Sequence, residues 1–178
     1  MHTLLLLFDI CLLRGKAQDL PTSSTLVALT ALAGILVDYL SLPDHGFNVA
    51  RLLFVASQTV LFGAGLWLVL KLRGFPARWT QTVTALYAAN AAFSLLLLPF
   101  LPALAETLKQ AQDIALGWQM VVVLAVSGWF IAVMVRVLRE AMESSLLGGF
   151  VVALALIFAV RVVGLTLAPL FGLHVATE

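Results

Sequence analysis

Charged residues, cysteines and histidines are scarce in this 178-residue chain, and each shortage excludes a class of protein. Charged side chains make up 11% of the sequence, whereas soluble globular domains carry about 25%. Hydrophobic residues make up 62% of the chain, so most of its surface cannot face water. The composition therefore predicts a membrane protein, and the length suits one domain.

The chain also lacks the residue groups on which most catalytic and metal sites depend. Its single cysteine, Cys11, excludes an intramolecular disulfide. The histidines His2, His45 and His174 lie far apart, and no His, Cys or carboxylate cluster has the spacing of metal ligands. The sequence contains no evident Ser/His/Asp or Cys/His constellation, and a net charge of +1 gives no field that would attract nucleic acid. We therefore expect no enzymatic activity, no metal, no cofactor and no nucleic-acid partner.

Long apolar segments, separated by short polar ones, are what the chain has in abundance. Each has roughly the 20 apolar residues that an α-helix needs to cross a bilayer. The five expected spans cover residues 24–42, 49–72, 79–101, 114–138 and 146–173. Thr22-Ser23-Ser24 supplies N-cap residues for the first span, and Pro169 is placed to end the last one early. The predicted fold is an all-α, polytopic membrane helix bundle in which residues 19–178 form the five-helix domain.

Residues 1–18 precede the first span and differ from a signal peptide. No Lys or Arg precedes the apolar run, Asp9 interrupts it, and no small-x-small cleavage site follows. The run over residues 2–13 is too short to cross a bilayer. We expect a short helix that lies in the membrane interface, with Arg14 and Lys16 at the lipid headgroups.

Lys and Arg residues near the span ends are divided unevenly between the two sides of the predicted bundle. Arg14, Lys16, Lys71, Arg73, Arg78, Arg136 and Arg139 fall on one side, and only Arg51 and Lys109 on the other. Because positively charged loops stay in the cytoplasm, we expect a cytoplasmic N-terminus and a C-terminus on the outer side.

The third span, residues 79–101, shows three faces when its residues are placed about 100° apart. The polar face contains Thr80, Thr84, Tyr87, Asn90, Ala91 and Ser94, the small-residue strip contains Gln81, Ala85, Ala88 and Ala92, and the expected lipid face contains Leu86, Ala89, Phe93 and Leu96. The hydroxyl groups of the polar face either bond to the helix itself or to a neighbouring helix, or they line a polar cavity; the first interpretation is favoured. This span is therefore the candidate centre of the bundle.

Four polar side chains fall at a similar depth within the spans. Counted from the cytoplasmic ends, Asp38 lies roughly 21 Å deep, Asn90 roughly 17 Å and Arg161 roughly 23 Å. Gln58 on the second span reaches a similar level. A charge there costs on the order of 3 kcal/mol, so it should turn inward and find a partner.

We therefore predict an ion pair between Asp38 and Arg161, with Asn90 and Gln58 completing a candidate binding cluster. The cluster is either a structural ion pair or part of a path for protons or substrate, and the favoured interpretation is structural. A third alternative places Asp38 at the outer interface.

Glycines predict sites of close helix contact, and one polar linker predicts ion pairs near the inner face. Small-residue sites occur at Gly63, Gly65, Gly128, Gly148 and Gly149. Near the linker of residues 139–145, REAMESS, Arg136 and Glu140 stand at i,i+4 spacing, as do Arg139 and Glu143. This linker is expected to be a solvated elbow on the inner face, with a docking patch for a cytoplasmic partner as the alternative.

Several local patterns carry a family resemblance. They are Asp19-Leu20-Pro21 before the first span, Arg78-Trp79-Thr80-Gln81-Thr82-Val83-Thr84-Ala85-Leu86-Tyr87 at the start of the third, Leu97-Leu98-Pro99 at its end, and Trp129 followed by Val137-Leu138-Arg139-Glu140. Together with the number of spans, they resemble the Yip-domain family of small five-span membrane proteins. The resemblance implies a five-helix bundle with a cytoplasmic N-terminal region. The chain lacks the long N-terminal region of the eukaryotic members, so it looks more like the short bacterial ones, and the link of the eukaryotic members to Rab GTPases is not carried over.

These observations favour a non-enzymatic protein of the bacterial inner membrane that acts as a scaffold or accessory subunit for membrane proteins or membrane organisation. Its expected partners are the lipid bilayer, other membrane proteins or further copies of itself. The alternative is a small transporter or permease whose midplane site is formed by Asp38, Gln58, Asn90 and Arg161. An intramembrane enzyme is the least favoured class, because neither metal ligands nor a nucleophile and base are evident.

Overall fold

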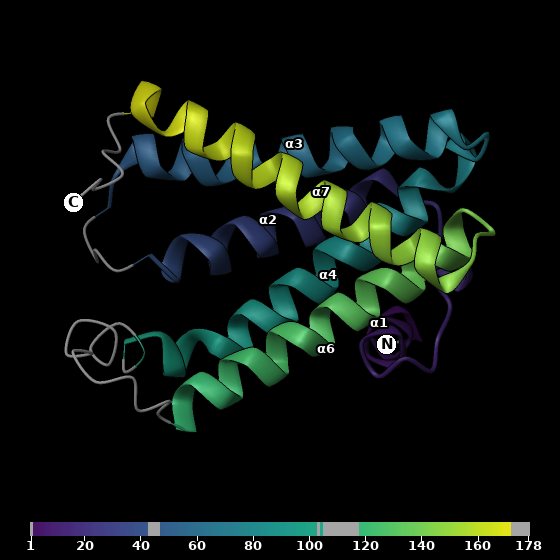
Figure 1. The fold of residues 1–178 in the computed structure, drawn as a ribbon, viewed down its shortest axis with the longest axis horizontal. Coiled ribbons are helices and arrows are strands. Elements are labelled where there is room, and N and C mark those ends of the chain that lie inside the picture. Colours follow the sequence, from purple (N-terminus) through teal and green to yellow (C-terminus); the bar gives the residue numbers. More distant parts are fainter. Residues whose placement is uncertain (1, 43–46, 103, 105–117, 172–178) are drawn as a thin grey trace.

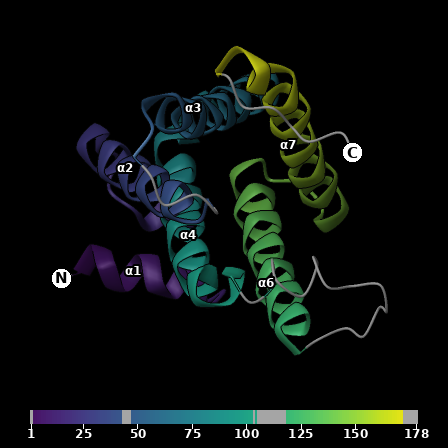
Figure 2. The same cartoon turned by 90° about the vertical axis from the view of Figure 1, so that its left-hand side faces the viewer.

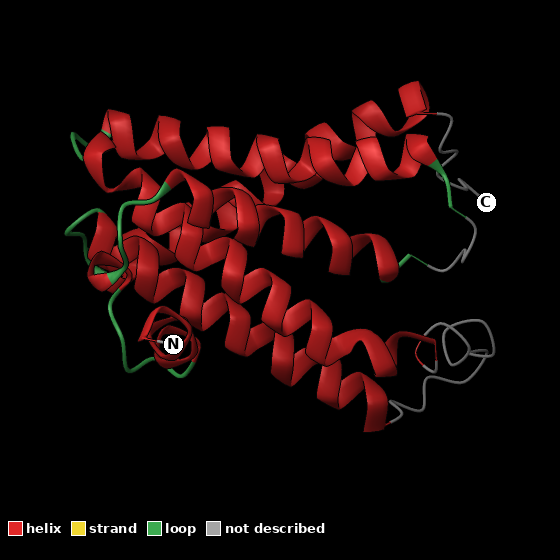
Figure 3. Cartoon of the chain, turned by 180° about the vertical axis from the view of Figure 1, so that it is seen from behind, coloured by secondary structure: helices red, strands yellow, loops and turns green. Residues whose placement is uncertain are grey.

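The computed structural model describes residues 2–42, 47–102, 104 and 118–171, and within these ranges the chain is helical without a strand (Figure 3). Four helical segments are long and apolar enough to cross a membrane: Val49–Leu72, Pro76–Phe100, Trp118–Ala141 and Leu146–Phe171. A further apolar helix, Ser24–Leu40, has 17 residues and is shorter than the other four. The all-α prediction is confirmed for the described residues, and four of the five expected spans have the length of a membrane helix.

The helices begin and end close to the expected positions. They are α1 (His2–Cys11), α2 (Ser24–Leu40), α3 (Val49–Leu72), α4 (Trp79–Leu97), α6 (Trp118–Ala141) and α7 (Leu146–Leu167). Short 3-10 turns lie at η1 (Ala17–Asp19), η2 (Pro76–Arg78), η3 (Leu98–Phe100) and η4 (Ala168–Phe171). As predicted, Pro169 ends the regular part of the last span, because proline cannot continue the α-helical hydrogen bonding. The expected start of the fourth span at residue 114 lies outside the described residues.

Polar side chains mark three of the helix starts. Ser23 accepts a hydrogen bond of 3.4 Å from a backbone amide in the first turn of α2, as the predicted N-cap cluster requires. Asn48 caps α3 in the same way at 2.8 Å, and Ser145 caps α7 at 3.1 Å. Each cap pairs an amide that the helix itself leaves without a partner.

The bundle is built around α4 (Figures 1 and 2). This helix packs against α2 and α6 and also contacts α1 and α3, whereas α7 packs on α3 and α6. Residues 82–87 of α4 are all buried. The central position predicted for the third span is confirmed.

The expected lipid face of α4 is wrong for most of its residues. Leu86 and Ala89 have exposed fractions of 1% and 0%, and the ring of Phe93 lies 5.7 Å from that of Phe130 on α6. Leu96 is exposed, as expected. The reason is that α6 covers this side of α4, so the apolar residues there pack on protein.

One end of the bundle gathers the connections that carry most of the charge. Residues 12–20, 71–78 and 136–145 lie at this end, where α3 and α7 converge with α4 and α6; at the opposite end the helices spread apart (Figure 1). These three segments contain seven basic and three acidic residues, a net charge of +4. All seven basic residues expected on the cytoplasmic side are included, and we term this region the basic end.

The N-terminal helix α1 runs across the long axis of the other helices (Figures 1 and 2). Ile10 is 2% exposed and belongs to the core, while Leu4, Leu5 and Phe8 are exposed. The indole of Trp129 on α6 donates a hydrogen bond of 2.8 Å to the carbonyl oxygen at the end of α1. The helix is thus held on the bundle by one apolar side and presents a second apolar side outward.

Glycine allows close contact at three of the five expected positions. A Cβ atom added at Gly149 would lie 2.7 Å from a backbone oxygen of α6, one at Gly65 would lie 3.1 Å from Leu156, and one at Gly63 would overlap the hydroxyl of Tyr87. At Gly128 no described residue lies within 4 Å of such an atom, and the neighbours of Gly148 belong to the preceding turn, so these two expectations are wrong.

Candidate functional site

Asp38 is the centre of a polar junction that joins α2 to α4. One carboxylate oxygen accepts a hydrogen bond of 2.9 Å from the Asn90 amide, and the other accepts one of 2.9 Å from the Ser94 hydroxyl. All three side chains are half-buried. Asn90 and Ser94 stand one turn apart on α4, so both donors reach the same carboxylate. Asp38, Asn90 and Ser94 are termed the polar junction.

Close approach of the two helices makes this junction possible. Gly34 lies one turn before Asp38 on α2, and a Cβ atom there would be 3.7 Å from the Asn90 amide nitrogen and 3.9 Å from a backbone oxygen of α4. Because no side chain stands between the helices at Gly34, the Asn90 side chain can turn toward Asp38.

The predicted ion pair between Asp38 and Arg161 is absent from the described part of the chain. The ion pairs of Arg78 with Glu143 and of Arg136 with Glu140 lie at the basic end. Arg161 is exposed on α7 and makes no hydrogen bond or ion pair with a described residue. The reason is the helix arrangement, since α7 packs on α3 and α6 whereas α2 packs on α4 and α3. A similar depth along α2 and α7 therefore does not bring Asp38 and Arg161 side by side.

Gln58 is also separated from Asp38, because it faces α7. A Cβ atom at Gly164 would lie 2.6 Å from the Gln58 side-chain oxygen, so glycine leaves room for this amide. The Gln58 amide nitrogen is buried and makes no hydrogen bond within the described residues. The expected cluster of four therefore divides into the junction that holds Asp38 and Asn90, the Gln58 contact with α7, and the exposed Arg161.

The hydroxyl groups along α4 are used for adhesion within and between helices. Thr84 donates to the backbone oxygen of Thr80 at 2.7 Å, one turn earlier. Tyr87 donates to the backbone oxygen of Thr59 on α3, also at 2.7 Å. For these two residues the favoured interpretation of the polar face is confirmed.

Arg78 ties the start of α4 to the end of α6 at the basic end. Its guanidinium donates to the backbone oxygens of Glu140 (3.4 Å) and Ala141 (3.1 Å) and pairs with the carboxylate of Glu143. A cation at a helix C-terminus satisfies carbonyls that have no partner in the helix and opposes the negative end of its dipole. Of the two i,i+4 pairs expected here, Arg136 with Glu140 is found at 3.0 Å, whereas Glu143 pairs with Arg78.

Gln81 holds the segment between α1 and α2. Its amide nitrogen donates to the backbone oxygens of Gln18 (2.8 Å) and Leu20 (2.7 Å), and the Gln18 amide donates in turn to the Glu140 backbone oxygen at 3.1 Å. The Trp79 indole donates to the backbone oxygen of Gly63 at 2.9 Å. The roles of Arg78, Trp79 and Gln81 were missed at the sequence level, although their polar groups at a span boundary were a usable signal.

The chemistry available in these arrangements is hydrogen bonding between helices. Within the described residues no group of three or more His, Cys, Asp or Glu residues is placed to hold a metal ion. Comparison with known proteins gives no match to a family model, to a curated protein or to a solved structure.

Proposed function

We propose that this protein is a non-enzymatic integral membrane protein that acts as a scaffold or accessory subunit for other membrane proteins. In this proposal α2 also crosses the membrane, which brings the number of spans to five, the basic end faces the cytoplasm, and the membrane is the bacterial inner membrane. The Yip-domain resemblance stays part of the same proposal.

The observation that carries this proposal is the use made of Asp38. Its carboxylate receives one neutral donor on each oxygen, both from α4, so this charged group serves to attach one helix to another. The Tyr87 bond to α3 and the Trp79 bond to Gly63 have the same character. Polar groups that bond one helix to another in this way support a stable helix bundle whose outward surface is apolar.

The full chain, expressed with a C-terminal tag and crosslinked in its native membrane before solubilisation in mild detergent, tests this function. A stoichiometric membrane-protein partner, or a second copy of the chain, is expected in the crosslinked fraction. The control omits the crosslinker, and a strictly monomeric protein without partners in both fractions contradicts the proposal.

A small transporter is the second candidate, because two polar side chains within the apolar helices have no hydrogen-bond or ion-pair partner among the described residues. The Gln58 amide nitrogen is buried without a hydrogen bond, and Arg161 makes neither a hydrogen bond nor an ion pair in the part of the chain that is described. If the protein transports a solute, Gln58→Leu and Arg161→Met should abolish the associated growth phenotype while the purified variants stay folded. Unchanged phenotypes in both variants would remove this candidate.

A further inference from the structure

A groove opens on the side of the bundle next to the contact between Trp129 and the end of α1. It lies between α1, α2, α4 and α6 and has a volume of about 880 Å³. Ala88, Ala91 and Ala92 of α4 line it together with leucine and phenylalanine side chains of α1. Two of these alanines belong to the small-residue strip of the third span, so part of that strip lines a hollow beside α1.

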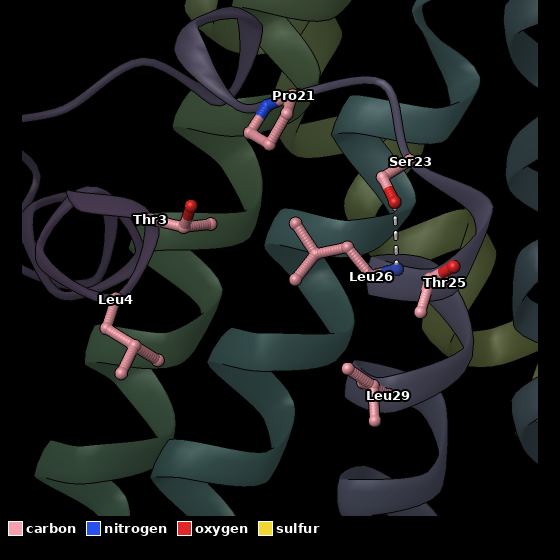
Figure 4. Close-up of a pocket in the computed structure, with 7 residues that line it drawn as sticks. All are labelled: Thr3, Leu4, Pro21, Ser23, Thr25, Leu26 and Leu29. Atoms are coloured by element: carbon pink, nitrogen blue, oxygen red, sulfur yellow. Dashed lines mark hydrogen bonds between the residues drawn. The ribbon is translucent and has the colours of Figure 1, made fainter. Parts of the chain in front are cut away.

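The groove continues into a smaller hollow at the start of α2. Leu4, Leu26 and Leu29 line both spaces, and the smaller one, about 320 Å³, is also lined by Thr3 and Thr25. Figure 4 shows Thr3 and Leu4 on the α1 side of this opening, with Leu26 and Leu29 on the α2 side. Ser23 lies at the same opening and uses its oxygen to cap α2, which leaves its hydroxyl proton free to be donated. The combined space is thus apolar along most of its length and carries hydroxyl groups at one end.

We propose that this space binds an anionic phospholipid of the surrounding bilayer, with its acyl chains in the groove and its headgroup at the hydroxyl-lined opening. Charge complementarity supports the choice of headgroup. The opening lies at the start of α2, directly after residues 12–20, the segment of the basic end whose own net charge is +1. Arg14 and Lys16 in that segment are exposed, and Asp19 is its single acidic residue.

The size of the groove distinguishes acyl chains from a partner helix. A volume of 880 Å³ is within the roughly 300–1,000 Å³ range of small-molecule sites. A helix about 10 Å across would fill that volume in roughly 11 Å, about two turns, whereas a membrane helix is about 30 Å long. An acyl chain is narrower than a helix, so it suits an apolar groove of this size bounded by α1.

Titration of the full chain in mild detergent tests this proposal. The protein is washed free of endogenous lipid, titrated with phosphatidylglycerol or with phosphatidylcholine of the same acyl chains, and examined by native mass spectrometry. One bound phosphatidylglycerol per chain is expected, with weaker binding of the zwitterionic lipid. Ala33→Trp and Ala92→Trp place a large side chain in the groove at exposed positions, so the core is not disturbed. Each should weaken binding roughly tenfold, equivalent to about two lost methylene contacts.

Matched variants separate the site from the general lipid-facing surface. Ala159→Trp makes the same change at an exposed position of α7 and should leave binding unchanged. Lys16→Gln should reduce the preference for phosphatidylglycerol, whereas Arg73→Gln, an equal charge change at an exposed position elsewhere on the basic end, should preserve it. Equal binding to the groove variants and to the wild type, equal affinity for both lipids, or a copurified protein that binds in place of lipid would each overturn the proposal.

Discussion

Replacement of Gly149 by alanine should separate α6 from α7 and lower the stability of the whole bundle. The new Cβ atom would lie 2.7 Å from the backbone oxygen of Val135 and 3.2 Å from the backbone nitrogen of Arg139. Both are backbone atoms of a helix, which cannot move aside as a side chain end can. Overpacking of this kind costs about 1–3 kcal/mol.

Gly128→Ala is the matched control for this experiment. Alanine is favoured over glycine inside a helix by up to about 1 kcal/mol, and this gain applies to both variants. No described residue lies within 4 Å of the atom added at Gly128, so only the gain is expected there. The propensity terms cancel in the comparison, and the difference in unfolding free energy between the two variants should be about 1–3 kcal/mol.

Thermal unfolding in detergent, followed by circular dichroism, measures this difference. For a chain of this length it corresponds to a gap of about 2–12 °C in midpoint temperature, with Gly149→Ala the less stable. Equal midpoints for the two variants would refute the close packing of α6 and α7 on which the reasoning rests.

Three further substitutions or reactions test other parts of the structure. Asp38→Ala should destabilise the protein by about 2–4 kcal/mol because it leaves two donors on α4 without an acceptor; equal unfolding midpoints for this variant and the wild type would contradict the polar junction. Arg78→Met should cost about 1–3 kcal/mol through the uncapped end of α6, and Arg73→Met, at an exposed position of the same end, is its control. Burial raises the pKa of the Cys11 thiol, so its reaction with maleimide in the folded protein should be slower at pH 7 than in the denatured chain and should rise with pH over a more alkaline range. Identical pH profiles for folded and denatured protein would show that Cys11 is not shielded.

Helix positions could be predicted well because their signals are local. The span expected at residues 49–72 agrees with α3 at both ends, where Asn48 caps the start and the helix gives way to a turn at Arg73 and Gly74. Apolar length and turn residues are properties of neighbouring residues, and no tertiary contact is needed to find them.

The partners of polar groups could be predicted only where one helix supplies them. The Arg136 and Glu140 pair follows from i,i+4 spacing and was found. The partner of Asp38 depends on which helices are neighbours, and a depth count carries no information on that choice. Its opposite charge makes Arg161 the partner that the sequence predicts, whereas the structure brings the neutral donors Asn90 and Ser94 to the carboxylate.

The network at the basic end implies an order of assembly during synthesis. Arg78 bonds to carbonyl oxygens 62 and 63 residues later in the chain, and Gln18 bonds to one 122 residues later. The N-terminal half of the chain is synthesised first, so these donors cannot find their acceptors until the end of α6 has emerged from the ribosome. Until then the side chains of Arg78 and Gln18 must remain hydrated or bound to the insertion machinery. A chain truncated before residue 140 should therefore keep its first helices in a loosely closed state that quality-control proteases can recognise.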